Sequence, residues 1–264
     1  MSLAPKLEAH ETPEVPDGDR SEQRMQSLTR AFQLLELMAA NGGSMSVSDL
    51  ASQSGLPLPT TYRVVNSMVS EGYVRRLQER GYALGPRLIG LGAVASRMLG
   101  ACADPFLEEL VEIVGETAGL AALDGESAAF VAQAPSRFAM RMTIEVGHRS
   151  PLHCTAVGKA ILAQLPLSQV KHLMTRTQML GYTPRTISSF PELKEELATI
   201  EKQGFAVDDG ESEKGLRSIA VSVPEAPVPM ALSILGPDSR LTIDTVMTIV
   251  PLLHSTAAKL MTCV

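Results

Sequence analysis

SVSDLASQSGLPLPTTYRVVNSMVSEGYVRRLQERGYALG, residues 46–85, is the stretch that decides the fold of the N-terminal part of this chain. Ser46, with Asp49 three residues later, is typical of a capped helix start, and Gly55 permits the left-handed conformation of a sharp turn. A further helix begins near Pro59, where the missing N–H costs little, and ends before Gly72. This pattern predicts two helices joined by a tight turn, an arrangement that places one helix in a DNA groove.

Polar side chains are expected to face outward from the second of these helices, because Val64, Val65, Met68 and Val69 form its apolar face. Hydroxyl, amide and guanidinium groups suit phosphates and base edges. The residues of this helix that we expect to contact DNA are Pro59, Thr60, Thr61, Tyr62, Arg63, Asn66 and Ser67.

After this helix the sequence predicts two short strands, at residues 73–77 and 81–84, which together form a wing. Arg75, Arg76 and Arg80 would lie near its tip, where each can neutralise a phosphate without reading sequence. Upstream, apolar residues recur at helical spacing from Leu28 until the glycines after Asn41. The alternative is a small three-helix domain whose polar face meets only water.

Six short motifs link this segment to the rest of the chain. They are GLP at 55–57, GYV at 72–74, YALGPRL at 82–88, HCTAVGKA at 153–160, GFAVDD at 204–209 and GLRSIA at 215–220. In this order they resemble the IclR family of bacterial transcriptional regulators, from about Ser27 to the C-terminus. The resemblance implies an α+β protein with an N-terminal winged helix-turn-helix, a linker helix, a C-terminal GAF-like (profilin-like) effector-binding domain, and assembly as a homodimer or homotetramer.

The chain departs from the family pattern at two positions that matter for its sites. Pro59 stands where relatives usually carry Ser or Thr, which removes a hydroxyl from the front of the DNA-reading helix and predicts altered operator preference. Ser218 stands where many relatives carry Cys.

Composition agrees with a soluble two-domain protein. The 264 residues are 45% hydrophobic and 20% charged, enough for a small and a larger domain with separate cores. Its three cysteines, Cys102, Cys154 and Cys263, are far apart, so neither a disulfide framework nor a zinc site is indicated. No apolar run reaches the ~18 residues of a membrane span, and the acidic start does not fit a signal peptide. We therefore expect a cytoplasmic protein with no membrane partner.

The charge distribution favours DNA binding although the whole chain has a formal net charge of −6. Residues 21–90 are the only positive segment, with seven arginines against five acidic residues, a net charge of +2. Arginine can form two-bond contacts with phosphate or guanine that lysine cannot. Because +2 is modest, we expect useful affinity to require two readers on one DNA.

The sequence predicts four segments: a disordered tail (1–23), the winged helix-turn-helix (24–86), a helix (87–103) and a larger domain (104–264). The resemblance implies that the third is the linker helix and the fourth the effector-binding domain. The apolar stripe of the linker, which includes Leu91, Val94 and Met98, could pack on its own domain or on a second copy, and the resemblance favours the second. In the last segment, helices are expected at 104–117, 156–165, 167–174, 191–203 and 241–261, and strands at 120–123, 128–132, 205–207, 219–223 and 230–235. Helices between hairpins indicate an antiparallel sheet with helices packed against it.

The expected effector site lies where a helix start meets polar strand residues. Backbone N–H groups of Ala156 and Val157 at a helix N-terminus attract carboxylates. By resemblance, Asp208, Ser218 and Ser233 supply side-chain contacts to a small organic acid. Asp208 would repel an anion unless it is protonated or meets a ligand hydroxyl. As alternatives, the serines satisfy local hydrogen bonds and Asp208 is a turn residue.

Catalytic, metal-binding and nucleotide-binding functions have less support in the sequence. Adjacent His153 and Cys154 point in different directions, which argues against a nucleophile and base, and His148 adds no paired metal-ligand spacing. Gly158 and Lys159 do not make a P-loop, because Ala160 stands where Ser or Thr is required. We therefore expect no cofactor, no metal and no enzyme, but a ligand-responsive repressor or activator that binds double-stranded operator DNA. The alternative is a ligand-binding module or small-molecule enzyme without DNA binding.

Overall fold

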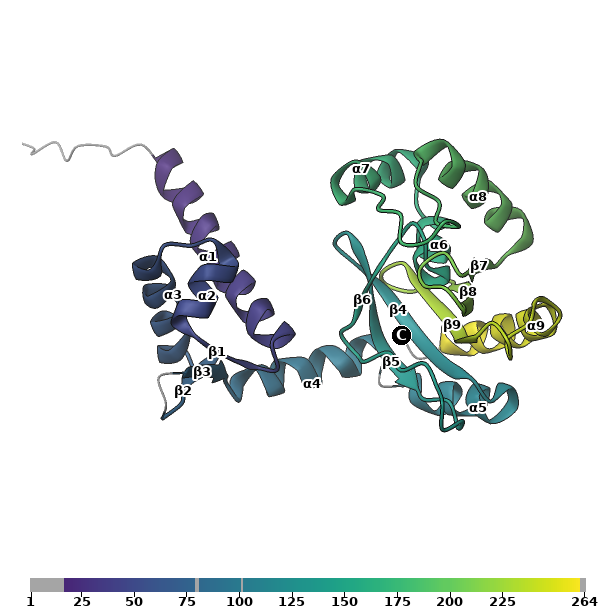
Figure 1. The fold of residues 1–264 in the computed structure, drawn as a ribbon, viewed down its shortest axis with the longest axis horizontal. Coiled ribbons are helices and arrows are strands. Elements are labelled where there is room, and N and C mark those ends of the chain that lie inside the picture. Colours follow the sequence, from purple (N-terminus) through teal and green to yellow (C-terminus); the bar gives the residue numbers. More distant parts are fainter. Residues whose placement is uncertain (1–16, 79–80, 101, 262–264) are drawn as a thin grey trace, which may run out of the picture. The chain divides into compact units, whose positions relative to one another are not determined.

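The computed structural model describes residues 17–78, 81–100 and 102–261, which form two compact units divided between Gly92 and Ala93 (Figure 1). The N-terminal unit has one hydrophobic core, and the C-terminal unit has two, one on each face of its sheet. No helix within these described ranges combines the length and apolarity needed to cross a membrane.

The N-terminal unit is a three-helix domain with a small antiparallel sheet of order β1-β3-β2. Its buried side chains include Leu34 and Met38 from the first helix, Leu50 from the second, and Val65 from the third. These contacts pack the three helices together. The elements are α1 (Asp17–Ala40), β1 (Ser44–Ser46), α2 (Val47–Ser54), α3 (Leu58–Ser70), β2 (Val74–Arg76) and β3 (Gly81–Leu84).

The helix-turn-helix forms as the sequence predicts. The Ser46 side chain accepts a hydrogen bond from the Asp49 N–H at 3.1 Å, which satisfies one of the free donors at the start of α2. Gly55 ends α2 with φ of 69°, in the left-handed region that favours glycine. Pro59 lies in the first turn of α3, where its missing N–H breaks no helical bond.

Two features of this unit differ from the sequence expectation. Residues 17–23 belong to α1, which corrects the expected boundary of the disordered tail. The other residues expected in the tail, 1–16, lie outside the described residues. Strand β1 was not predicted, because three residues are too short to show an alternating pattern; it pairs Met45 with Tyr82 of β3.

The linker helix α4 (Arg87–Leu99) follows β3 and is shorter than the expected 87–103. It ends before Gly100, whose backbone lies so close to strand β5 that an added Cβ would be 2.8 Å from the Val131 carbonyl oxygen. Along α4, Ile89, Leu91, Val94 and Met98 are exposed large apolar side chains. The predicted apolar residues Leu91, Val94 and Met98 are therefore exposed among the described residues.

The C-terminal unit is built on a six-stranded, fully antiparallel sheet of order β6-β5-β4-β9-β8-β7. This confirms the predicted antiparallel sheet with packed helices. The strands are β4 (Thr117–Asp124), β5 (Ser127–Ala134), β6 (Arg149–Pro151), β7 (Ala206–Asp209), β8 (Leu216–Val223) and β9 (Met230–Pro237). The three-residue strand β6 was not predicted.

Helices cover both faces of this sheet (Figure 1). Helices α5 (Asp104–Val114) and α9 (Ile243–Leu260) pack on one face, and α6 (Ala156–Leu162), α7 (Leu167–Thr177) and α8 (Phe190–Gln203) lie on the other. Helix α5 stops three residues earlier than expected, because Gly115 adopts a left-handed φ of 83°. On the α6 face the sheet presents small residues such as Ala121, Ala220 and Ser233, which leave space above the strands.

Candidate functional site

The outer face of α3 presents most of the side chains that the sequence assigned to DNA contact. Pro59, Tyr62, Arg63 and Ser67 are exposed, with Tyr62 at 49% of its full surface. Thr60 and Asn66 are half-buried at the edge of the same face. The face thus offers a guanidinium, hydroxyls and an amide, which are the groups that bond to phosphates and base edges.

Thr61 is a correction to the expected DNA-contacting set. Its side chain is fully buried, and its hydroxyl donates to the Pro57 carbonyl oxygen at 3.2 Å. It lies four residues before Val65 and seven before Met68, which places all three on the core face of α3. Thr61 therefore stabilises the start of the helix and does not present its hydroxyl to DNA.

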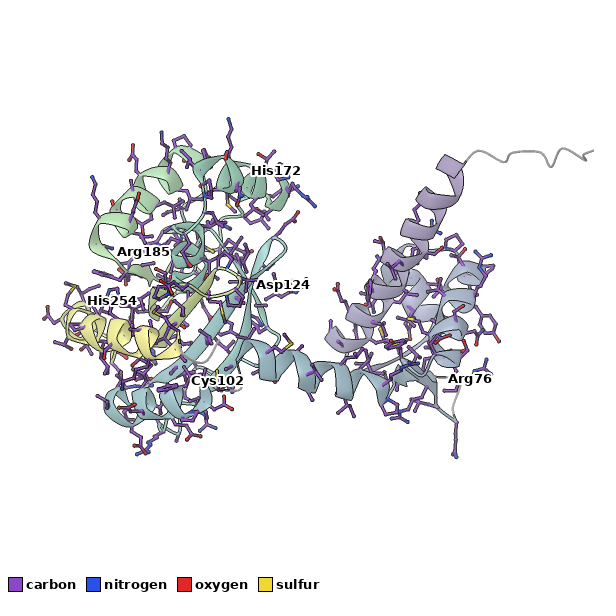
Figure 2. The ribbon with its side chains drawn as sticks, turned by 180° about the vertical axis from the view of Figure 1, so that it is seen from behind. Arg76, Cys102, Asp124, His172, Arg185 and His254 are labelled. Carbon is purple, nitrogen blue, oxygen red and sulfur yellow. The ribbon has the colours of Figure 1, made fainter. Side chains whose placement is uncertain are left out.

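The wing arginines extend this face. Arg75 and Arg76 on β2 are both exposed, and Arg76 is labelled in Figure 2. Arg76 donates to the Asn66 side-chain oxygen, which ties the wing to α3. Arg80, the third arginine expected here, lies outside the described residues. The fold thus places the two positive charges of Arg75 and Arg76 beside α3, the helix expected to contact DNA, which we call the recognition helix.

Arg87 has a role that the sequence reasoning missed. Its guanidinium donates to the Glu71 carbonyl oxygen at 2.8 Å and lies over the Tyr73 ring, 5.2 Å from the ring centre. Cations at helix C-termini and over aromatic rings are stabilised in this way. Arg87 therefore fixes the first residue of α4 to the end of α3, a contact that only the fold could reveal.

A cavity of about 280 Å³ lies on the α6 face of the C-terminal sheet. Four of the five residues expected to bind an effector line it, namely Val157, Asp208, Ser218 and Ser233. Ala156 is fully buried and is not among the lining residues. The other lining residues are Phe130, Met142, Thr143, Ile144, His148, Ser150, Pro151, Thr155, Ser212, Glu213, Leu216 and Leu235.

Strand register explains how the three polar side chains meet. Asp208 on β7 lies directly opposite Ser218 on β8. Ser218 in turn lies opposite Leu235 on β9, so Ser233 is its diagonal neighbour on the same face of the sheet. Residues far apart in the sequence therefore form one polar wall of the cavity.

Asp208 is fully buried and is a turn residue as well as a cavity residue. Its Oδ1 accepts from the Glu211 N–H at 2.7 Å and the Ser212 N–H at 3.3 Å, and its Oδ2 accepts from the Ser212 hydroxyl. Burial raises the pKa of Asp208, whereas these hydrogen bonds lower it. Asp208 therefore organises the turn, as the alternative interpretation expected, and it also lines the cavity.

The hydroxyl of Ser233 makes a hydrogen bond within the sheet. The Ser233 hydroxyl donates to the Gly119 carbonyl oxygen at 3.1 Å, which leaves its lone pairs as acceptors. Gly119 itself has to be a glycine, since a Cβ there would lie 2.7 Å from the Phe130 ring. Phe130 can thus pack across the sheet and form the apolar wall of the cavity.

The start of α6 meets the cavity through Thr155 and Val157. The Thr155 hydroxyl donates to the Pro151 carbonyl oxygen at 2.7 Å and accepts from the Gly158 N–H at 3.1 Å. Gly158 allows the helix to approach the strand before it, because a Cβ would lie 2.5 Å from the Leu152 backbone. The helix start is therefore held rigidly against the cavity.

Among the described residues that line this cavity there is no lysine or arginine, and the charged or titratable ones are Asp208, Glu213 and His148. A carboxylate there would be held by hydroxyl and backbone N–H donors, and a ligand hydroxyl could donate to Asp208. A fully buried Lys159 lies on α6 but pairs with Glu196 and Glu211. The sequence reasoning missed this cluster.

The buried Cys154 does not have the properties of a nucleophile. Burial raises the pKa of its thiol to about 12, and the neighbouring Asp208 and Glu211 act in the same direction. The ring of His153 is nearly parallel to that of Tyr182, and its Nε2 lies 3.0 Å from the Leu180 carbonyl oxygen. Within the described part of the chain, no three His, Cys, Asp or Glu side chains are grouped to hold a metal ion.

A winged helix-turn-helix and a separate unit with a ligand-sized cavity define a two-domain transcriptional regulator. Comparison with known families agrees: residues 27–78 match the IclR helix-turn-helix domain, and residues 92–262 match the bacterial transcriptional regulator IclR C-terminal domain. The chain therefore belongs to the IclR family of bacterial transcriptional regulators, with a DNA-binding domain and an effector-binding domain.

Individual relatives are similar over most of their length. The chain is 40% identical to the transcriptional repressor IclR of Escherichia coli K12 over 230 residues, 84% of each chain. It is 32% identical to the repressor AllR of Klebsiella pneumoniae over 242 residues, 90% of this chain and 89% of that one.

Solved structures show the same fold. A putative IclR regulator from Silicibacter sp. TM1040 has a TM-score of 0.80 and 30% identity, and the match covers 89% of this chain and 95% of that one. An IclR homologue from Microbacterium hydrocarbonoxydans, complexed with 4-hydroxybenzoate, has a TM-score of 0.74 and 26% identity, and the match covers 89% and 98%.

Proposed function

We propose that this protein is a repressor that binds a palindromic operator as a dimer and is controlled by a small organic acid in the C-terminal cavity. The observation that carries the proposal is the outward face of α3, where Tyr62, Arg63 and Ser67 are exposed beside the wing arginines. The similar proteins from Escherichia coli and Klebsiella are named as repressors, which favours repression over activation.

In this proposal α3 enters the major groove. Arg63 reads a guanine, while Thr60, Tyr62, Asn66 and Ser67 supply further contacts to bases or phosphates. Pro59 at the front of the helix contributes only an apolar contact. Arg75 and Arg76 neutralise phosphates, and we assign the same role to Arg80.

Dimerisation would bring two readers onto one DNA. The exposed apolar side chains of α4, with Met98 at 70% of its full surface, are the surface that we assign to the second copy. The net charge of +2 over residues 21–90 supports this assignment, because one such reader neutralises few phosphates. Two dimers could assemble further into a tetramer.

The effector that we propose is a small carboxylate. Its anionic group would accept from the N–H group of Val157 and from the Ser218 hydroxyl. Ser233, whose hydroxyl already donates to Gly119, could accept from a ligand hydroxyl. A hydroxyl elsewhere on the ligand could donate to Asp208. The 4-hydroxybenzoate in the similar protein from Microbacterium has both groups, a carboxylate and a hydroxyl.

Gel-shift titration of the full-length protein against DNA fragments that flank its own gene tests this function. We expect one fragment to form a site-specific complex whose affinity falls steeply between 50 and 200 mM salt, on the order of 10³-fold for six phosphate contacts. A protein that binds carboxylates but forms no site-specific complex would instead be a ligand-binding module without DNA binding.

A further inference from the structure

Lys159 is the largest side chain that the core of the C-terminal unit buries completely, with 1% of its surface exposed. It lies in the middle of α6, a short helix whose seven residues are all buried. An ammonium group is stable in such a place only when it is paired and hydrogen-bonded, since water cannot solvate it. Its partners therefore define what the residue does.

Two carboxylates from different parts of the unit pair with Lys159. Its Nζ lies 2.8 Å from Oε1 of Glu196 on α8 and 2.5 Å from Oε1 of Glu211, which follows β7. The Glu196 side chain is 30% exposed and the Glu211 side chain only 11%. Oε2 of Glu211 is buried without a hydrogen-bond partner, so Lys159 is the group that holds this carboxylate in place.

Glu211 belongs to the turn that forms one wall of the cavity. Its N–H donates to Asp208, and its carbonyl oxygen accepts from the Thr186 hydroxyl at 2.6 Å. Asp208, Ser212 and Glu213 line the cavity, whereas Glu211 and Lys159 do not. Lys159 thus contacts the turn through Glu211 without lining the cavity.

We propose that Lys159 is a positioning residue for the effector cavity: by pairing with Glu211 it fixes the turn of residues 208–213, without touching the ligand. The inference rests on the proposed effector site and deepens it. Lys159 would determine effector affinity by holding Asp208 and Ser212 where the ligand meets them.

The charged and titratable groups around Glu211 predict a pH signature. Lys159 faces it from α6, Glu196 from α8 and Asp208 from β7, and the Cys154 thiol lies nearby. Burial raises the pKa of Glu211 to about 7, while Lys159 acts in the opposite direction. As the pH falls from 8 to 6, Glu211 takes up a proton. Because its pKa is higher in the folded turn than in water, this uptake favours the closed turn over the opened one.

Hydrogen exchange on the full-length protein tests the inference without a ligand. We expect Lys159→Met to lower the protection factors of the Glu211 and Ser212 amides at least tenfold at pH 8, while the control Glu196→Gln changes them less than twofold. In the wild type these factors should rise as the pH falls from 8 to 6, because the closed turn binds the Glu211 proton more tightly than the opened turn does, and Glu211→Gln should remove that step. If Lys159→Met does not fold, the Glu211→Gln comparison decides alone.

Calorimetry with 4-hydroxybenzoate and acetate tests whether Lys159 also determines effector affinity. For whichever of them binds the wild type, Lys159→Met should weaken binding at least tenfold and Glu196→Gln should not. Turn protection within twofold of wild type in a folded Lys159→Met, or an unchanged pH step in Glu211→Gln, would overturn the inference. If neither carboxylate binds the wild type, the proposed effector class is weakened, and the exchange data still decide the role of Lys159.

Discussion

Asn66 on the recognition helix accepts a hydrogen bond from Arg76 on the wing, so the two elements that we assign to DNA are joined by their own side chains. Arg87 makes a second connection, from the start of α4 to the carbonyl oxygen of Glu71 at the end of α3. The recognition helix, the wing and the start of the linker are therefore expected to move as one body.

The recognition helix gives the first prediction. Arg63→Ala should weaken operator binding by about 1–3 kcal/mol and relax the preference at one base pair, because a two-bond contact with guanine is lost. Fluorescence anisotropy with operator and single-base variants measures both effects. Arg137→Ala, at an exposed arginine of the C-terminal unit, is the matched control and should leave the affinity unchanged. If Arg63→Ala and the wild type discriminate equally between the operator and its single-base variants, Arg63 does not read a base.

The wing should behave differently from the helix. Arg75→Ala is expected to weaken binding to all DNA sequences alike and to reduce the slope of log affinity against log salt by about 0.9, the value for one phosphate contact. A salt titration on operator and random DNA measures this. A loss confined to the operator would mean that Arg75 reads bases.

The exposed apolar residues of α4 predict that a negative charge placed among them disrupts the dimer. Val94→Glu should shift the protein from dimer to monomer in sedimentation velocity and weaken DNA binding, because a carboxylate would be buried between two copies. Met247→Glu, at an exposed apolar residue of α9, is the control and should stay dimeric. A dimeric Val94→Glu would place the interface elsewhere.

The polar wall of the cavity predicts a separation of the two functions. Ser218→Ala should weaken carboxylate binding by about 1 kcal/mol, which is the usual value of one hydrogen bond, and leave ligand-free DNA affinity unchanged. Calorimetry and anisotropy measure these separately. Ser222→Ala, at a residue of the same strand that does not line the cavity, is the control.

Glu211 predicts the pH dependence of stability. Its pKa is raised by burial from 4.5 to about 7 in the folded protein, so its contribution is fully present below pH 4.5 and is lost as the pH rises through about 7. Chemical denaturation at pH 5 and pH 8 should show this loss, on the order of 2 kcal/mol, in the wild type. Glu211→Gln should show a smaller difference between the two values of pH.

Local signals were sufficient to predict α2 of the first unit. Ser46 and Gly55 act on their own neighbours in the chain, so the start and end of α2 could be predicted without the fold. Thr61 was wrongly assigned to DNA although its spacing from Val65 and Met68 places it on the core face. A hydroxyl in a recognition helix was given more weight than its position on that helix.

Long-range contacts explain what the sequence could not predict in the second unit. Asp208, Ser218 and Ser233 were found through family resemblance, and only strand register shows that they share one face. Lys159 was missed because its partners are 37 and 52 residues away, and a lysine in an apolar run gives no sign of them. Arg87 was missed for a similar reason.

The central claim is that a ligand in the C-terminal cavity controls DNA binding by the N-terminal unit. The most direct test is the dissociation constant of the full-length protein for its operator, with and without a carboxylate that calorimetry shows to bind. We predict a change of at least fivefold in the wild type, as is typical of allosteric coupling, and a smaller change at the same ligand concentration in Ser218→Ala. An operator affinity that stays the same when the cavity is saturated would contradict the account.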